Sequence, residues 1–146
     1  MITIKNTQNM GWVDFKKIYP FILSCLDKLQ KQDPFFINKD RILTDCARGN
    51  SVLWLVFDGS KPLIIVIVSL RKTDLGHRFV YLDYASGTLA GKAEEIIEKV
   101  IMTLEQWAKE NEAVFIEICG RLGWQNYLKK YHFKTIRQIY RRYLDD

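Results

Sequence analysis

Long apolar runs and targeting signals are missing from this chain of 146 residues. A helix that crosses a bilayer needs about 20 consecutive apolar residues, and the longest apolar run, residues 63–70, has only the length of a strand. The first residues lack the basic segment and apolar core of a signal peptide. We therefore expect no membrane span, no leader and a cytoplasmic location.

Cysteine and histidine are scarce. Cys25, Cys46 and Cys119 are odd in number and far apart, which disfavours both a disulfide framework and a zinc site. We expect all three to be reduced core residues. With only His77 and His132 in the chain, a multi-histidine metal site is strongly disfavoured, and the sequence predicts no bound metal.

Positive charge exceeds negative charge, giving a formal net charge of +5. Much of the excess comes from basic residues near the C-terminus: Arg121, Lys129, Lys130, Lys134, Arg137, Arg141 and Arg142. A basic face serves nucleic acid, an acidic partner or a phosphate-bearing cofactor. Bases could stack on Tyr140 and Tyr143, but a solvated rim explains most of these residues better. Nucleic acid is therefore the least favoured partner.

Apolar spacing predicts strands and helices along the whole chain. Strands are expected at residues 1–5, 51–57, 63–70, 78–84, 114–119 and 134–143, and helices at residues 11–32, 38–47, 89–108 and 125–131. Pro20 predicts either two helices or one bent helix in the first helical segment, and Asn38 is a suitable cap for the second. No linker or repeat interrupts this order. We expect one domain over residues 1–146 with an α+β or mixed α/β fold.

Residues 78–119 organise the second half of the chain. A strand, a loop, a long amphipathic helix and a second strand form a crossover, which favours a parallel strand pair. Backbone N–H groups at a helix start suit a pyrophosphate, and two glycines in residues 85–92 permit close approach. A plain turn capped by Ser86 or Thr88 fits the same residues equally well.

The order of elements, together with the residues of the second half, resembles the GNAT superfamily of acyl-coenzyme A-dependent N-acetyltransferases. The likeness is carried by residues 79–108, by the strand at 114–119, and by Tyr131-His132-Phe133-Lys134, which is similar to the family's Tyr/x-Gly-Phe-x signature. It implies a GNAT-like fold, with a central mixed, mostly antiparallel sheet that splays after residue 119 and is flanked by helices. It also implies acetyl-CoA as a substrate and an amine-bearing small molecule or protein as the acceptor.

The resemblance implies two sets of site residues. Residues at the strand end and in the following loop would bind coenzyme A: Leu82, Tyr84, Ser86, Gly87, Thr88, Gly91, Lys92 and Arg121. Four residues would serve acid and base catalysis: Asp83, Glu117, Tyr127 and Tyr131. For the two carboxylates an ion pair with Arg78 or Arg121 is the alternative, and the tyrosines would otherwise line the groove. Arg121 would grip a phosphate or pair with a carboxylate.

A more specific likeness points to short GNAT-like proteins of tailed bacteriophages. Its motif is Gly-Arg-Leu-Gly-Trp at 120–124, followed by Leu-Lys-Lys-Tyr-His-Phe at 128–133. Residues 85–92 depart from the family's phosphate-loop spacing, and Leu128 stands where a catalytic tyrosine is usual. A catalytically silent domain in a virion, or bound to a host protein in the host cytoplasm, is therefore the alternative function. Exposed strand edges would allow a homodimer.

Overall fold

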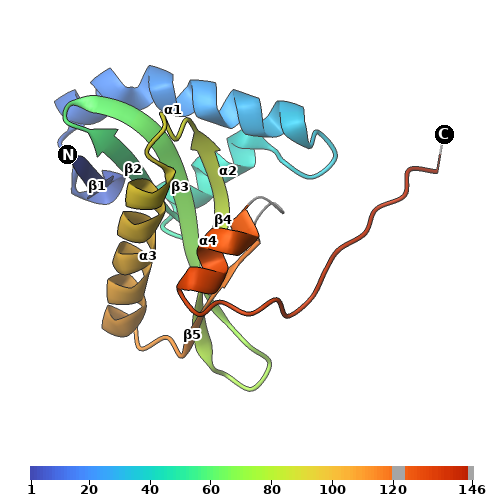
Figure 1. Ribbon diagram of the computed structural model, residues 1–146. Coiled ribbons are helices and arrows are strands. Elements are labelled where there is room, and N and C mark those ends of the chain that lie inside the picture. Colours follow the sequence, from blue (N-terminus) through green and yellow to red (C-terminus); the bar gives the residue numbers. More distant parts are fainter. Residues whose placement is uncertain (120–123, 145–146) are drawn as a thin grey trace.

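The computed structural model describes residues 1–119 and 124–144 (Figure 1). In that part of the chain, five strands form one sheet in the order β1-β2-β3-β4-β5. Their bounds are β1 Ile2–Asn6, β2 Val52–Asp58, β3 Lys61–Lys72, β4 Arg78–Gly87 and β5 Phe115–Ile118. The first four strands pair antiparallel, whereas β4 and β5 pair parallel. The crossover predicted from the sequence is confirmed.

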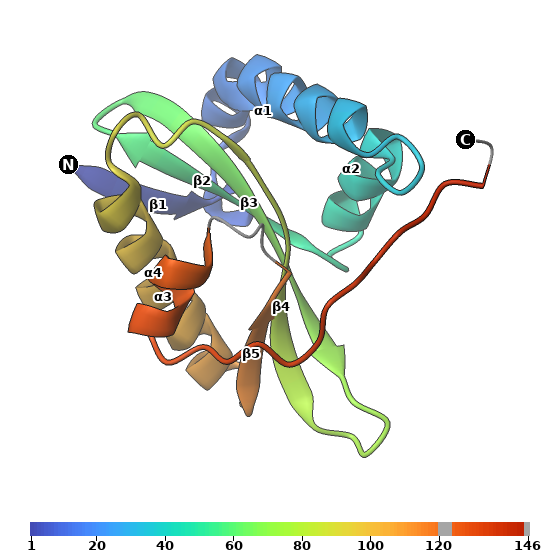
Figure 2. The same cartoon turned by 45° about the vertical axis from the view of Figure 1, so that its right-hand side comes forward.

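Helices cover both faces of this sheet (Figures 1 and 2). They are α1 Trp12–Gln32, α2 Lys39–Ala47, α3 Ala93–Glu110 and α4 Gln125–Lys130, with a 3-10 turn η1 at Thr7–Asn9. The first helical segment is one helix with Pro20 inside it, so the alternative of two separate helices is wrong. Asn38 caps α2 as predicted, since its side chain accepts hydrogen bonds from the N–H groups of Asp40 and Arg41.

The core forms two layers, because the middle strands are apolar on both sides. On one face, residues such as Trp54, Val66 and Leu82 pack against α3. On the other face, residues such as Leu55 and Ile67 pack against α1 and α2. No helix among the described residues has both the length and the apolar character that a bilayer span requires.

The structure places the boundaries of the loop at residues 85–92 differently from the prediction. The prediction that β4 stops at residue 84 is wrong, because β4 pairs with β3 as far as Ser86 opposite Ile65 and Gly87 opposite Ile64. Likewise α3 starts at Ala93 rather than at residue 89, since Ala90 and Gly91 have positive φ angles that a helix cannot contain. The loop between β4 and α3 therefore comprises only residues 88–92.

The predicted final strand is wrong. Residues 134–144, which we call the C-terminal tail, run from α4 past β5 toward α2 without joining the sheet (Figures 1 and 2). Its apolar side chains fall on both sides of the extended chain, so they give no single face to bury. Ile136 and Ile139 are accordingly 77% and 80% exposed.

Candidate functional site

The pairing between β4 and β5 ends near the middle of β4. They pair from Phe79 opposite Phe115 to Leu82 opposite Ile118, where β5 ends. β4 continues to Gly87, and within the described residues no strand pairs with residues 83–87 on the β5 side. We call this stretch the open edge of β4. Each residue of a strand carries one donor and one acceptor, so the outward N–H and C=O groups of this edge could bond to a ligand. Among the described residues, the Gly87 carbonyl already accepts a hydrogen bond from Lys28 Nζ at 3.4 Å.

A β-bulge lies where the open edge begins. Leu82 stands opposite Val68 and Tyr84 stands opposite Ile67, so Asp83 is an extra residue in β4. A bulge bends its strand, increases the local twist and re-aims side chains and backbone groups, and bulges are frequent next to active sites. The bulge thus turns β4 at the point where it separates from β5.

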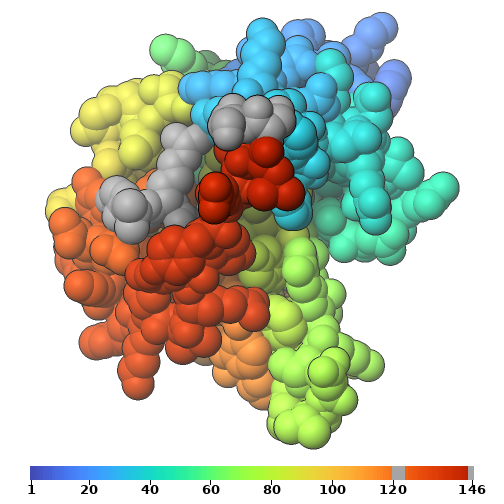
Figure 3. Space-filling model, turned by 90° about the vertical axis from the view of Figure 1, so that its right-hand side faces the viewer, coloured from blue at the N-terminus to red at the C-terminus, as the bar shows by residue number. Residues whose placement is uncertain are grey.

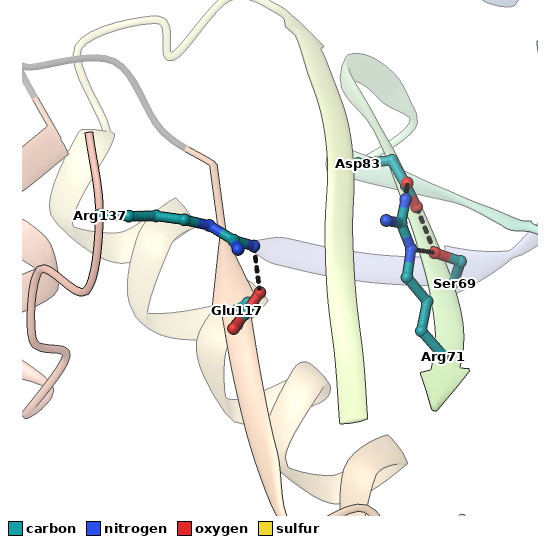
Figure 4. Close-up of polar contacts among 5 residues, drawn as sticks. All are labelled: Ser69, Arg71, Asp83, Glu117 and Arg137. Atoms are coloured by element: carbon teal, nitrogen blue, oxygen red, sulfur yellow. Dashed lines mark hydrogen bonds and ion pairs between the residues drawn. The ribbon is translucent and has the colours of Figure 1, made fainter. Parts of the chain in front are cut away.

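The carboxylate of Asp83 is held by two donors (Figure 4). Ser69 Oγ donates to Asp83 Oδ2 at 2.7 Å, and Arg71 forms an ion pair with Oδ1. The Arg71 guanidinium also stacks over the ring of Tyr81, 4.0 Å from its centroid. The alternative of an ion pair is therefore present, but with Arg71 rather than Arg78 or Arg121. Arg71 comes from the end of β3, and only the register of β3 on β4 reveals it.

Glu117 lies on the neighbouring strand and is less constrained. Its Oε2 is 3.4 Å from Arg137 of the C-terminal tail, and 28% of its side chain is exposed, against 12% for Asp83. Ile116 and Ile118 pack into the core on the α3 side, so alternation places Glu117 on the α1/α2 face beside Tyr81. Burial raises the pKa of the Tyr81 hydroxyl above its ordinary value.

A small cavity opens beside Asp83 on the same face. It has a volume of about 250 Å³ and lies between α2 and the strands β3 and β4. Its charged and polar lining includes Arg41, Asp45, Arg71, Asp83 and Tyr84. We call it the α2 pocket. Figure 3 shows this side of the molecule, where the C-terminal tail passes between α4 and the helices α1 and α2.

The loop before α3 offers backbone donors rather than free cations. Lys92 is the N-cap of α3 and makes no side-chain capping bond, so the first N–H groups of the helix have no cap. Its Nζ pairs with Asp58 at 2.7 Å, and this contact, with the N-terminal amine, lowers the pKa of Asp58. Glu94 and Glu95 occupy the first turn. The dipole of α3 is thus partly balanced by the chain's own acids.

The predicted coenzyme A residues are dispersed over several parts of this region. Thr88, Gly91 and Lys92 lie in the loop, whereas Ser86 and Gly87 lie in β4. Ser86 is buried, and its Oγ donates to the carbonyl of Cys25 in α1, so its side chain points away from the loop. The remaining residues are Leu82 at the last pair with β5, Tyr84 in the α2 pocket and Arg121, which lies outside the described residues.

The predicted proton donors lie in or next to α4: Tyr127 is inside the helix and Tyr131 is its C-cap residue. Tyr127 and Tyr131 are half-buried, and both ribbon views place α4 on the α3 side of the sheet (Figures 1 and 2). Asp83 and Glu117 lie toward the opposite face. The two carboxylates therefore lie toward one face of the sheet, whereas the α4 helix itself lies on the side of α3. Residues 1–119 and 124–144 contain no cluster of three or more His, Cys, Asp or Glu that could hold a metal ion.

The cysteines match the prediction only in part. All three are free, but Cys119 is exposed rather than buried. Cys119 follows the end of β5 directly, where the strand has left the core. Burial raises the pKa of the Cys25 thiol, and burial with nearby Asp45 raises that of Cys46 to about 11.

Comparison with known proteins identifies the fold. No protein-family model and no curated protein matches the sequence. Among solved structures, glucosamine-6-phosphate N-acetyltransferase from Arabidopsis thaliana has a TM-score of 0.68 at 13% identity, over 99% of both chains. A predicted acetyltransferase of Clostridium acetobutylicum with acetyl-CoA has a TM-score of 0.68 at 13% identity, over 99% of this chain and 97% of that one.

A GCN5-related N-acetyltransferase from Ralstonia eutropha is similar to the same degree, with a TM-score of 0.68 at 14% identity over 98% of this chain and 99% of that one. These likenesses extend over nearly the full length of each chain. The chain therefore has the GNAT acetyltransferase fold, with a mixed sheet flanked by helices, as the sequence resemblance implied.

Proposed function

We propose that this protein transfers an acetyl group from acetyl-CoA directly to the amine of an acceptor molecule. The observation that carries the proposal is the open edge of β4, which ends at the loop before α3. The pantetheine arm of coenzyme A carries amide groups, which can bond to an unpaired strand edge as another strand would. The uncapped N–H groups at the start of α3 would then meet the pyrophosphate.

The likeness to solved structures supports the same proposal. The neighbour from Clostridium acetobutylicum is described with acetyl-CoA, and several other neighbours are named as acetyltransferases. Their names do not share one acceptor. The acceptor must therefore be inferred from the side chains of this chain rather than from its neighbours.

In the proposed reaction, the amine nitrogen attacks the thioester carbonyl carbon and the C–S bond breaks. A backbone N–H at the β4 bulge would stabilise the oxyanion, and Glu117 would take the proton that the amine loses, directly or through one water. The departing thiolate then takes a proton, for which Tyr127 and Tyr131 are the proposed donors. Asp83 is held by Ser69 and Arg71, which suits a positioning role better than proton transfer.

Calorimetry with acetyl-CoA tests the proposal, and absence of heat at millimolar ligand would overturn it. The role of Glu117 is tested with Glu117→Gln. General-base catalysis contributes about 10²- to 10⁴-fold, so kcat should fall by that range while acetyl-CoA still binds. Glu105→Gln on the exposed side of α3 is the matched control and should leave kcat unchanged. Unchanged kcat in Glu117→Gln would remove Glu117 from the mechanism.

One observation favours a second candidate function, a catalytically silent binding domain. Lys92 is engaged by Asp58, and Glu94 and Glu95 would repel a pyrophosphate at the start of α3. The resemblance to bacteriophage proteins rests on residues 120–133, and a virion or host-protein partner remains a proposal. A stable complex together with no binding of acetyl-CoA would support this function, whereas turnover would exclude it.

A further inference from the structure

The two walls of the α2 pocket carry different charge arrangements. On the β3–β4 wall, Arg71 and Asp83 form an ion pair, so their charges largely cancel. On the α2 wall, Arg41 and Asp45 lie four residues apart and therefore on one side of the helix. Within residues 1–119 and 124–144, neither of these two side chains forms an ion pair with the other or with a third residue.

The pocket thus holds one cation and one anion whose charges are still available to a ligand. Asp45 is half-buried and Arg41 is exposed, so a ligand could reach both from solvent. A guanidinium binds carboxylate or phosphate by two parallel hydrogen bonds, and a carboxylate accepts hydrogen bonds from an ammonium group. The formal charge of the four ionised groups sums to zero, which favours a ligand that carries both signs of charge.

The size and position of the α2 pocket further limit the class of ligand that it can bind. A volume of about 250 Å³ is below the usual range of about 300–1,000 Å³ for drug-sized ligands, so a peptide or a polyamine would not be enclosed. A polycation would also meet Arg41 and Arg71 without a net negative lining to balance them. The pocket includes Asp83, the residue at which β4 leaves β5. A ligand amine there would lie beside the open edge of β4.

We infer that the α2 pocket binds a small molecule that carries both an amine and an anionic group. The anionic group would bind Arg41, and the amine would lie between Asp45 and the β4 bulge. This inference deepens the proposed function and, for the acceptor role, rests on it. Carboxylate and phosphate would be recognised by the same chemistry, so the experiment includes both.

Matched pairs of amines test the inference. L-leucine is compared with isopentylamine, which lacks the carboxylate, and O-phosphoethanolamine with ethanolamine, which lacks the phosphate. Binding is measured by saturation-transfer NMR without cofactor, and acetylation by release of free coenzyme A thiol. A charge-assisted contact is worth about ten- to a hundredfold, so at least one anionic member should exceed its partner by that factor in both readouts.

Variants assign the effect to the pocket. Arg41→Gln should abolish the preference for the anionic member, and Asp45→Asn should weaken binding of both members of a pair. Arg48→Gln and Asp40→Asn serve as matched controls, because these residues are exposed on the same helix segment but do not line the pocket. Both variants should leave the preference for the anionic member and the binding of both members unchanged.

The possible outcomes separate the inference from the proposed function. Equal use of both members of each pair, or binding of neither, overturns the inference even if acetyl-CoA binds. A preference that survives Arg41→Gln also overturns it. If acetyl-CoA does not bind but the anionic amines still bind in an Arg41-dependent way, the ligand chemistry is supported and the transferase proposal fails.

Discussion

Replacing Gly87 by alanine should destabilise the protein more than any other glycine substitution among the described residues. A Cβ built on Gly87 would lie 2.1 Å from the carbonyl oxygen of Leu63 and 2.7 Å from Cα of Ile64, and the φ angle is +142°. To relieve the overlap, the end of β4 must move away from β3. That motion breaks the hydrogen bond from the Thr88 N–H to the Leu63 carbonyl, which is 2.9 Å long.

The magnitude follows from these two effects. A non-glycine residue in this φ region costs about 1–3 kcal/mol, and each lost backbone hydrogen bond costs about 0.5–1.5 kcal/mol. With one or two bonds lost, the free energy of unfolding should fall by about 1.5–6 kcal/mol. Domains of this size are stable by about 5–15 kcal/mol, so Gly87→Ala should lose a large share of its stability.

Urea unfolding followed by tryptophan fluorescence measures the loss, because Trp54 is buried against Trp107. Gly91→Ala is the matched control. Gly91 also has a positive φ angle, of +73°, but its Cβ would meet nothing within 4 Å, so only the smaller cost of a left-handed residue, about 1–2 kcal/mol, applies. A Gly87→Ala variant no less stable than Gly91→Ala would refute the close approach of β3 and β4.

Three further predictions concern charge. The double variant Glu94→Gln/Glu95→Gln should bind acetyl-CoA more tightly, with a Kd measured by calorimetry that is lower by about two- to fivefold per residue. The reason is that a charge at a helix start is worth about 0.3–1 kcal/mol. A higher Kd would mean that the pyrophosphate binds elsewhere. The pKa of Asp58 is lowered in the folded protein by its hydrogen bonds, so its contribution to stability is present above the ordinary value of about 3.9 and is lost as pH falls through the lower folded value. The stability difference between wild type and Asp58→Asn should accordingly shrink below about pH 4 in acid titrations of urea unfolding, and a constant difference would contradict the ion pair. In thiol labelling of the native protein at pH 8 read by mass spectrometry, exposed Cys119 should react first and Cys46, whose pKa is raised to about 11, only after unfolding; labelling at equal rates would contradict this order.

The sequence predicted most of the architecture because the relevant signals are local. The apolar spacing of α3, the hairpin before β3 and the cap at Asn38 each depend on residues close together in the chain, and each is present in the structure. The parallel pairing of β4 with β5 followed from the crossover that joins them. Helix and strand boundaries at residues 85–92 failed because Ser86 and Gly87 are held by β3 and α1, which are distant in sequence.

The composition of the candidate site was less predictable. Asp83 and Glu117 could be named as strand carboxylates, but their partners, Arg71 and Arg137, are set by strand register and by the path of the C-terminal tail. Arg41 and Asp45 gave no signal in the sequence, since charged residues on a short helix are usually solvated. Only the packing of α2 beside β3 and β4 turns them into the wall of a pocket.

The different environments of Asp83 and Glu117 indicate which carboxylate is better suited to act as the general base. A general base must exchange its proton within each cycle, so a carboxylate with fewer fixed partners is better suited to the role. Asp83 has two donors and an exposed fraction of 12%, whereas Glu117 has one contact at 3.4 Å and an exposed fraction of 28%. The partner of Glu117 lies in the C-terminal tail, outside the sheet, so a shift of the tail would free this carboxylate without disturbing the core. Asp83 could be freed only by breaking contacts with Ser69 and Arg71 of the neighbouring strand β3. On these grounds we assign the proposed proton transfer to Glu117 on β5, and in this proposal the bulge in β4 would position the groups around the acyl carbon.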